Sequence, residues 1–302
     1  MTEREPDLSP ASERLAGTSV SGLPTPNRGE PELLVVADPD AAAREAAERI
    51  AAALIAAVER HGRADFCTTG GSTPIPIYRL LSESPLCDRI PWQQVHVWWG
   101  DDRYVPRGHP ESNVTALDDV LLGGGAGGRG GECGRGSAPL PTANIHPFPT
   151  DRAIAENRDN GWCAARYAEE MARRLPLADG NWPVFDLILV GVGDDGHLLS
   201  VFPDSPALDR MEWAMGIPAP SHIGPHLPRV TVNPRLLEAA PVLVVTWGRD
   251  QGRGPGPRLW RGARRPPLAC PANPPPRRGL DRRRSCGWAD SGPAALIPAR
   301  LR

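Results

Sequence analysis

Short apolar runs alternate with helix-forming segments along most of the chain, and this alternation constrains the fold more than any other feature. The runs at residues 32–38, 64–70 and 185–193 are short and apolar at their centres, as strands are when both faces of their sheet are covered. An Ala-rich stretch lies between the first two runs, with Asp38 placed to cap it and Gly62 placed to end it. The pattern predicts an α/β fold with a mostly parallel sheet and helices on both faces.

The same criteria locate the other elements of this domain, which we expect to span residues 31–246. Strands are expected at residues 32–38, 64–70, 93–101, 185–193, 228–233 and 240–248, with a short edge segment at 144–149. Helices are expected at residues 39–62, 75–81, 112–122, 151–175 and 234–239.

Three segments fall outside the pattern. Residues 1–30 are rich in Pro, Ser, Thr, Gly and charge, which predicts a disordered N-terminal extension. Residues 123–137 are Gly-rich without an apolar period, which predicts a flexible surface insertion. Residues 247–302 combine 10 Pro with 13 Arg and show no helical or strand period, so we expect an aberrant, disordered tail.

The composition excludes several classes of protein. No run reaches the roughly 18–20 apolar residues of a membrane span, and the N-terminus lacks the apolar stretch of a signal peptide. The net charge is −2, but the tail carries +10 from 13 Arg against 3 Asp, which leaves −12 on residues 1–247 and argues against nucleic-acid binding there. The six cysteines show no C-x-x-C pair or metal-finger spacing, so we expect no disulfide framework and a cytoplasmic location.

Three polar loops each follow a predicted strand, at residues 70–74, 101–106 and 191–197. In open parallel sheets, ligands bind beyond the carboxyl ends of the strands, at the point where the strand order reverses. Their shared placement predicts that the three loops line one pocket.

The first loop, GGSTP, offers a site for an anion. Gly70 and Gly71 let the backbone approach a ligand, while Ser72 and Thr73 add hydroxyl donors at the start of a helix. The alternative is an ordinary strand-to-helix turn with a Ser or Thr cap. The loop matches neither a Walker A motif nor G-x-G-x-x-G, so no nucleotide is implied.

Arginines accompany the second loop and a later strand. Arg103 follows two aspartates, and it is either a surface ion pair or a fork for phosphate, the group that arginine binds best. Asn113 lies in the same block, within HPESN. Arg229, taken alone, is a solvated charge at a strand edge, and only its place after the polar loops makes it a candidate phosphate ligand.

The third loop, GVGDDGH, carries the sharpest signal. Asp195 lies two residues before His197, and a carboxylate that orients one imidazole nitrogen leaves the other free to accept a proton. A lone histidine is more often structural, but the glycines around this one leave its backbone bare. No metal site is expected, because His222 and His226 lie in a Pro-rich segment that cannot form the helix needed to align them.

Together these stretches resemble the 6-phosphogluconolactonase family, within the wider group that includes the glucosamine-6-phosphate deaminases. The resemblance covers residues 31–246 and implies the Rossmann-like fold of sugar-phosphate isomerases and lactonases. SVFPDSPAL looks like the lactonase continuation, where a deaminase usually shows Asn-Glu-Pro. The matching stretches, in the family's order, are TTGGSTP, WWGDDRYVP with HPESN, FDLILVGVGDDGHLLSVFP, and PRVTVN.

The resemblance implies hydrolysis of 6-phospho-D-glucono-1,5-lactone to 6-phospho-D-gluconate, without a metal or organic cofactor, by a monomer or weak homo-oligomer. His197 would activate water and Asp195 would orient it. Two alternatives stay open: an amino-sugar-phosphate deaminase or isomerase, and a non-catalytic sugar-phosphate-binding protein. The substrate-binding residues implied are Gly70, Gly71, Ser72, Thr73, Arg103, Asn113 and Arg229.

The sequence departs from the family at several points. Leu198 stands where the family has a small hydroxyl residue, and no lysine precedes Arg229, because the chain contains none. After Thr246 the family continues with Gly-x-x-Lys, whereas this chain has GRDQG. The segment is either part of a basic binding arm or the product of a frameshift in the gene. The codons of GRDQG, read one base later, permit Gly-Ala-Thr-Lys, which favours the frameshift, and sequencing the locus distinguishes the two.

Overall fold

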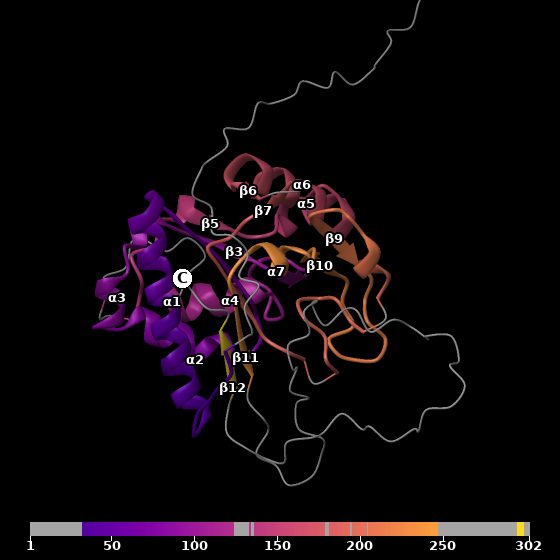
Figure 1. The fold of residues 1–302 in the computed structure, drawn as a ribbon. Coiled ribbons are helices and arrows are strands. Elements are labelled where there is room, and N and C mark those ends of the chain that lie inside the picture. Colours follow the sequence, from indigo (N-terminus) through magenta and orange to yellow (C-terminus); the bar gives the residue numbers. More distant parts are fainter. Residues whose placement is uncertain are drawn as a thin grey trace, which may run out of the picture.

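Five strands of the central sheet run parallel and form the frame of the molecule (Figure 1). The computed structural model describes residues 32–123, 133, 136–178, 181–193, 195–203 and 205–246, together with the backbone of 295–298. The strands, in sheet order, are β1 (Leu34–Val35), β12 (Ala295–Pro298), β11 (Val242–Thr246), β8 (Leu187–Val190), β2 (Ala64–Thr68), β3 (Val95–Trp99) and β5 (Ile145–His146). The predicted α/β fold with a mostly parallel sheet is confirmed.

The strand order reverses between β2 and β8. From β2 the chain moves outward to β3 and β5, and it then returns to the other side of β2 to form β8 and β11. Phe66 of β2 lies opposite Leu187 of β8, and Cys67 lies opposite Ile188. The carboxyl ends of β2 and β8 therefore open side by side, at the point where sheets of this kind bind ligands.

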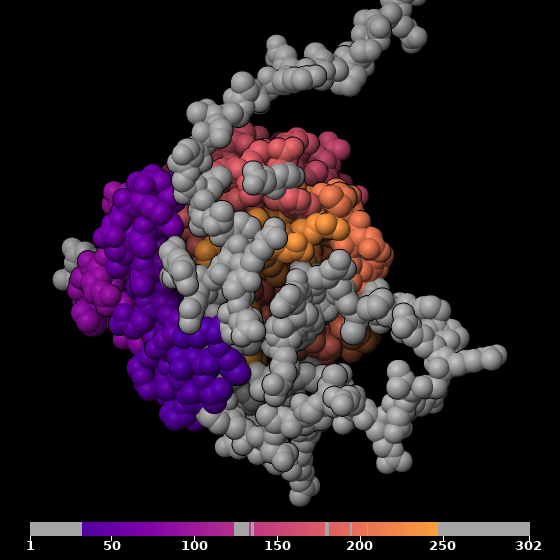
Figure 2. Space-filling model, viewed as in Figure 1, coloured from indigo at the N-terminus to yellow at the C-terminus, as the bar shows by residue number. Residues whose placement is uncertain are grey.

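Helices cover the sheet on both sides. α1 (Pro39–His61) begins at Asp38, whose side chain accepts a 2.7 Å hydrogen bond from the Ala41 N–H, and it ends at Gly62 with φ +81°, as the sequence predicts. Its buried face is mostly alanine, which lets it pack closely on the sheet. Figure 2 shows the N-terminal helices, in indigo, and the orange residues of the later strands at opposite sides of the molecule.

The remaining elements are short and mainly connect the two layers. The helices are α2 (Pro74–Ser82), α3 (Leu86–Arg89), η1 (Trp92–Gln94), α4 (Asn113–Ala116), η2 (Leu117–Leu121, a π-helical turn), η3 (Thr142–Asn144), α5 (Thr150–Ala155), α6 (Asn160–Arg174), η4 (Pro206–Asp209) and α7 (Leu236–Ala239). The other strands are β4 (Asp101–Arg103), β6 (Leu177–Ala178), β7 (Trp182–Pro183), β9 (Ala214–Ile217) and β10 (Arg229–Val232). Within the described residues, no helix combines the length and the apolar character that crossing a bilayer requires.

A second sheet, not expected from the sequence, holds β4, β10 and β9 in antiparallel order. The expected strand at 93–101 ends at Trp99, and the chain passes through Gly100 into β4 of this second sheet. A Cβ atom at Gly100 would lie 2.6 Å from Leu199 Cδ2, so a larger residue there would require the Leu199 side chain to move. The expected strand at 228–233 likewise becomes β10 and pairs with β4 rather than with the parallel strands.

The helix expected at 151–175 is two helices. The chain leaves α5 at Asn157, which has a left-handed φ of +51°, and it re-enters a helix at Asp159. The Asp159 side chain accepts a 2.7 Å hydrogen bond from the Trp162 N–H and so caps α6. The helix expected at 112–122 similarly divides into α4 and the π-helical turn η2.

The segments expected to be disordered fall largely outside the described residues. This is the case for residues 1–30, and for most of 123–137 and 247–302. Within the tail, however, Ala295–Pro298 form β12 between β1 and β11, which corrects the expectation of no strand there. β12 pairs with the edges of β1 and β11, which would otherwise lack a neighbouring strand.

The structure contains a disulfide between Cys87 of α3 and Cys133, which the sequence analysis did not expect. The two residues are 46 positions apart, and Cys133 lies within the Gly-rich segment 123–137, so spacing alone gives no sign of the pair. Cys67 and Cys163 are free and buried. The disulfide ties α3 to the Gly-rich insertion.

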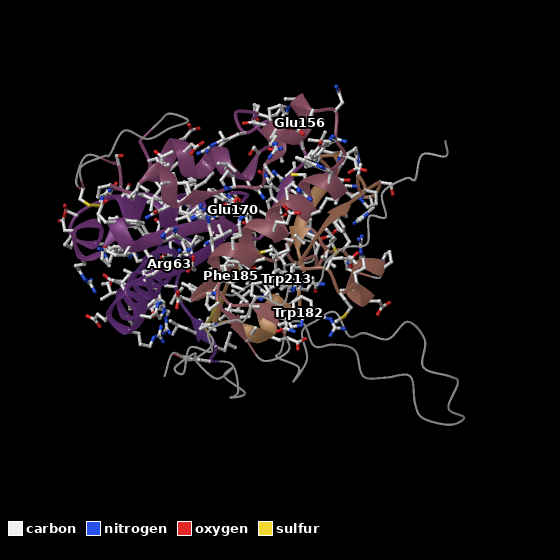
Figure 3. The ribbon with its side chains drawn as sticks, turned by 90° about the horizontal axis from the view of Figure 1, so that it is seen from above. Arg63, Glu156, Glu170, Trp182, Phe185 and Trp213 are labelled. Carbon is white, nitrogen blue, oxygen red and sulfur yellow. A yellow bond between two sulfur atoms is a disulfide. The ribbon has the colours of Figure 1, made fainter. Side chains whose placement is uncertain are left out.

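Tyr167 of α6 joins the parallel sheet to the layer that carries β4, β10 and β9. Its hydroxyl accepts a 3.0 Å hydrogen bond from the Trp99 N–H and donates one of 3.0 Å to the Trp99 carbonyl. The side chain is fully buried, in the aromatic cluster that includes Trp98 and Phe185, the latter labelled in Figure 3. Trp99 lies beyond the two residues of β3 that pair with β5, and the tyrosine takes the place of a strand neighbour.

We predict that Tyr167→Phe lowers the free energy of unfolding by about 2–4 kcal/mol, because it leaves a buried N–H and a buried carbonyl unpaired. Tyr104→Phe is the matched control: its hydroxyl also donates to a backbone carbonyl, that of Arg158, but at an exposed position. We expect the control to lose less than about 1 kcal/mol. Urea unfolding of the two variants measures the difference, and equal losses would contradict this role of Tyr167.

Candidate active site

The three polar loops lie together at the reversal in strand order, as the sequence predicts. A Cβ atom at Gly191, after β8, would lie 3.9 Å from Thr73 Oγ1, after β2. A Cβ atom at Gly70 would overlap the side chain of Asn113, which belongs to the second loop. Only glycine permits this close approach of the first two loops.

Asp195 and His197 form a hydrogen-bonded pair in the third loop. Asp195 Oδ1 lies 2.5 Å from His197 Nδ1 and also accepts a 3.1 Å hydrogen bond from the His197 N–H. The loop closes through a 2.9 Å hydrogen bond from the Gly193 N–H to the His197 carbonyl. A Cβ atom at Gly193 would lie 2.2 Å from the imidazole, so this glycine makes room for the ring.

The charge state of Asp195 fixes the tautomer of His197. Burial opposes ionisation of the carboxyl, but hydrogen bonds from His197 and His222 outweigh it and lower the pKa of Asp195. An ionised carboxylate only accepts, so His197 carries its proton on Nδ1 and leaves Nε2 as a base. The side chain of His197 is 19 % exposed, enough to meet a water molecule and a substrate.

Arg103 and Arg229 lie opposite each other in the β4–β10 pair. Arg229 is 3 % exposed, and its burial, together with the nearby Arg103, lowers its pKa. The Nε atoms of both arginines are buried without a hydrogen-bond partner in the described part of the chain. Two adjacent cations with unpaired donors favour an anionic ligand.

Arg103 does not pair with the two aspartates that precede it, which corrects the interpretation as a surface ion pair with them. Its Nη1 donates to the Glu111 carbonyl at 2.7 Å, and the same atom lies 3.7 Å from the Glu111 carboxylate. Asp101 and Asp102 are buried and bonded elsewhere. The arginine therefore keeps donors available for a ligand.

Asp102 organises the second loop. It accepts hydrogen bonds from the Arg103 N–H at 2.7 Å, the Asn113 N–H at 2.6 Å and the Ser112 hydroxyl at 3.0 Å. Burial raises its pKa to about 7, although the three donors oppose that rise. Asn113 donates from Nδ2 to the Asp101 carbonyl at 2.8 Å, and its buried Oδ1 has no partner among the described residues.

The first loop keeps its donors free. Gly71 has a left-handed φ of +82°, and Thr73 is the N-cap of α2 without a capping hydrogen bond from its side chain. The alternative role of this loop as a hydroxyl-capped turn is therefore not met. Ser72 is exposed and Thr73 half-buried, both directly before α2, whose first three residues offer only the Ile75 N–H to an anion because Pro74 and Pro76 have none.

Three residues of the site were not identified from the sequence. Ser200 is fully buried and donates a 2.5 Å hydrogen bond to Asp101 Oδ2. The Phe202 ring lies 4.9 Å from the His197 ring and 5.4 Å from the Arg229 guanidinium. His222 Nε2 lies 2.9 Å from Asp195 Oδ2, a contact across 27 positions that no local pattern signals.

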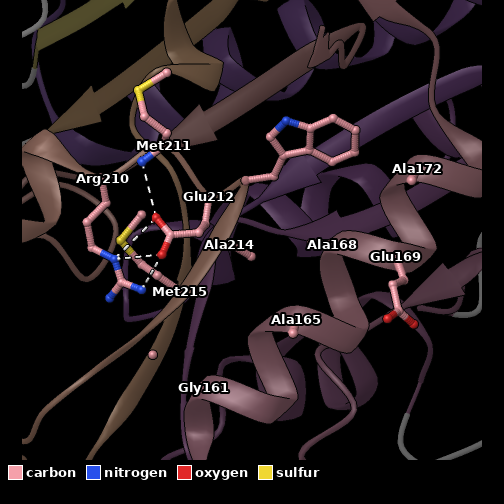
Figure 4. Close-up of a pocket in the computed structure, with 12 residues that line it drawn as sticks. Gly161, Ala165, Ala168, Glu169, Ala172, Arg210, Met211, Glu212, Ala214 and Met215 are labelled. Atoms are coloured by element: carbon pink, nitrogen blue, oxygen red, sulfur yellow. Dashed lines mark hydrogen bonds and ion pairs between the residues drawn. The ribbon is translucent and has the colours of Figure 1, made fainter. Parts of the chain in front are cut away.

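A separate cavity of about 540 Å³ lies between α6 and β9 (Figure 4). Its walls include Ala165, Ala168, Trp213 and Met215, with the ion pair Arg210–Glu212 at one side, and none of the predicted site residues lines it. In the described part of the chain, no group of three or more His, Cys, Asp or Glu residues could hold a metal ion. The candidate active site is thus the loop cluster around His197.

The chain is similar in sequence to known proteins. A sequence profile of the family described as glucosamine-6-phosphate isomerases/6-phosphogluconolactonase matches residues 37–252. A 6-phosphogluconolactonase of Streptomyces coelicolor is 30% identical over 233 residues, which cover 73% of this chain and 80% of that relative. One of Synechocystis is 38% identical over 157 residues, which cover 50% of this chain and about half, 54%, of that relative.

The fold is also similar to that of solved structures. The 6-phosphogluconolactonase from Trypanosoma cruzi superposes with a TM-score of 0.56 at 26% identity, over 68% of this chain and 76% of that one. The profile match extends over most of the described domain, and the parallel sheet and the order of the loops are those that the sequence analysis expects. The chain therefore belongs to the family of glucosamine-6-phosphate isomerases and 6-phosphogluconolactonases.

Proposed function

We propose that this chain hydrolyses 6-phospho-D-glucono-1,5-lactone to 6-phospho-D-gluconate, a step of the pentose phosphate pathway. One observation carries the proposal: an oriented histidine base lies in the same loop cluster as two buried arginines whose Nε atoms are unpaired. A lactone with a phosphate group needs both a base for water and cations for the phosphate. The relatives named 6-phosphogluconolactonase support the same activity.

His197 acts as the general base. Its Nε2 takes a proton from water while the water oxygen forms a bond to the lactone carbonyl carbon, and Asp195 stabilises the resulting imidazolium. The tetrahedral intermediate then breaks the bond between that carbon and the ring oxygen. The proton passes from His197 to the ring oxygen, so one water is added and the base is restored.

The other residues bind the substrate. Arg103 and Arg229 hold the phosphate or stabilise the developing negative charge. Gly70–Thr73 supply backbone and hydroxyl donors at the N-terminus of α2. Asn113 Oδ1, a buried acceptor without a partner among the described residues, suits a hydroxyl group of the sugar.

We further propose that the protein binds a small sugar phosphate and neither nucleic acid nor a membrane. It is a cytoplasmic monomer or weak homo-oligomer. The deaminase alternative predicts ammonia release from glucosamine 6-phosphate, and the binding-protein alternative predicts affinity for 6-phosphogluconate without turnover. Both are tested beside the lactonase assay.

We predict that His197→Ala lowers the lactonase rate by about 10²–10⁴-fold, because a positioned base contributes that much. Asp195→Asn should lose a large part of the rate as well, since the carboxylate both orients and charges the imidazole. The assay uses freshly generated lactone and subtracts its spontaneous hydrolysis. Turnover of a folded His197→Ala protein near the wild-type rate would refute the assignment.

A second prediction concerns phosphate binding. Arg103→Lys keeps the charge but loses the planar fork and its Nε donor, so we expect KM to rise about tenfold and kcat to change less than about threefold. Arg107→Lys is the matched control, because Arg107 is 21% exposed against 20% for Arg103 but is committed to Asp118 at 2.6 Å. We expect the control to lose stability without a change in KM. Steady-state kinetics and thermal unfolding of both variants measure this, and equal KM values in the two variants would contradict it.

A further inference from the structure

The carboxylate of Asp195 contacts two imidazole rings, those of His197 and His222. Oδ1 faces His197 Nδ1 at 2.5 Å, and Oδ2 faces His222 Nε2 at 2.9 Å. An ionised carboxylate accepts on both oxygens, so the neutral His222 ring carries its proton on Nε2. The two histidines thus share one anion between them.

The position of His222 is fixed by its neighbours, although its side chain is 50% exposed. The next residue, Ile223, packs against the apolar cluster that contains Phe202. The Phe202 ring meets the His222 ring edge-on at 5.0 Å and lies 4.9 Å from the His197 ring. Further along the same loop, His226 Nδ1 lies 2.7 Å from the Pro220 carbonyl.

Charged and titratable groups near His222 come from several elements. Asp195 and His197 belong to the loop after β8. Arg229 of β10 lies 5.4 Å from the Phe202 ring, which also contacts the His222 ring. Arg103 of β4 lies beside Arg229. Asp195 is the one described carboxylate within hydrogen-bonding distance of His222, and it is the group through which His222 acts.

We propose that His222 is a positioning residue: it holds Oδ2 of Asp195 so that Oδ1 meets His197 Nδ1. The proposal rests on the lactonase function proposed above. An Asp held at one oxygen only can turn about its side-chain torsions, and loss of alignment by 1 Å is enough to slow a reaction strongly. Binding at the second oxygen removes that freedom.

Three variants test the proposal. His222→Gln retains an N–H donor of similar reach but does not titrate, and His222→Ala removes the donor. His226→Ala, in the same loop and outside the site, is the matched control. We expect His222→Ala to lower kcat about tenfold with KM within about twofold, His222→Gln to restore kcat to within about threefold, and the control to behave as the wild type.

Rescue by glutamine separates positioning from mere packing, because Gln restores a donor to Asp195 Oδ2 but not the imidazole ring. Circular dichroism confirms that each variant is folded, and should His222→Ala fail to fold, the comparison of His222→Gln with the wild type still decides. A kcat of His222→Gln about tenfold or more below that of the wild type would overturn the proposal.

A measurement independent of turnover distinguishes this proposal from the proposed function. The NMR resonance of the His197 Nδ1 proton reports its hydrogen bond to Asp195. It should be present in the wild-type and His222→Gln proteins and weakened or lost in His222→Ala. If the wild type has no lactonase activity but this pattern is present, the proposed function fails and the positioning role stands. If activity is present and the resonance is the same in all three proteins, the positioning role is refuted.

Discussion

β2 and β8 pair over only two positions on each strand, yet this contact decides where the functional loops lie. Because the pair spans the reversal in strand order, the loop after β2 and the loop after β8 open next to each other, and Thr73 Oγ1 comes within 3.9 Å of the Cβ position of Gly191. A slip of one residue would shift β8 by about 3.3 Å and turn its side chains to the opposite face. The loop that holds Asp195 and His197 would then no longer lie beside the loop after β2, and the site would not form.

The second sheet contributes what the parallel sheet cannot. A parallel strand presents its end to the ligand, but the antiparallel pairing of β4 with β10 sets two arginines side by side along the strands. Leaving both Nε atoms buried and unpaired costs about 1–3 kcal/mol each in the free protein. The aromatic and aliphatic core, with Trp98, Tyr167 and Phe185 fully buried, offsets that cost. Unpaired donors of this kind are typical of a binding site, because a ligand recovers the lost hydrogen bonds.

The sequence predicts the parts of this site that local patterns encode. The apolar runs locate β2, β3, β8 and β11, and the spacing of Asp195 and His197 within a glycine-rich loop predicts their contact, because two residues in one turn have few other arrangements. Features that depend on the tertiary fold were not predictable. They are the division of one expected strand at Gly100, the Asp101–Ser200 hydrogen bond across 99 positions, and the disulfide between Cys87 and Cys133. His222 is the clearest case, because the Pro-rich segment around it indicates no role as a metal ligand and gives no sign that it contacts a carboxylate 27 positions away.

Two carboxylates of the loop cluster respond to pH in opposite directions, and together they bound the range in which the site is stable. The pKa of Asp195 is lowered in the folded protein, so its contribution to stability is present above the pKa of the unfolded chain and is lost as the pH falls through the folded value. Burial raises the pKa of Asp102 to about 7, so the folded protein holds a proton that the unfolded chain has already released, and stability decreases as the pH rises from about 4 through 7. Asp102 accepts hydrogen bonds from Ser112, Asn113 and the Arg103 backbone, so its ionisation places a buried charge on the substrate-binding side, while protonation of Asp195 in acid weakens the base. The two carboxylates together therefore favour the folded state most between these two limits.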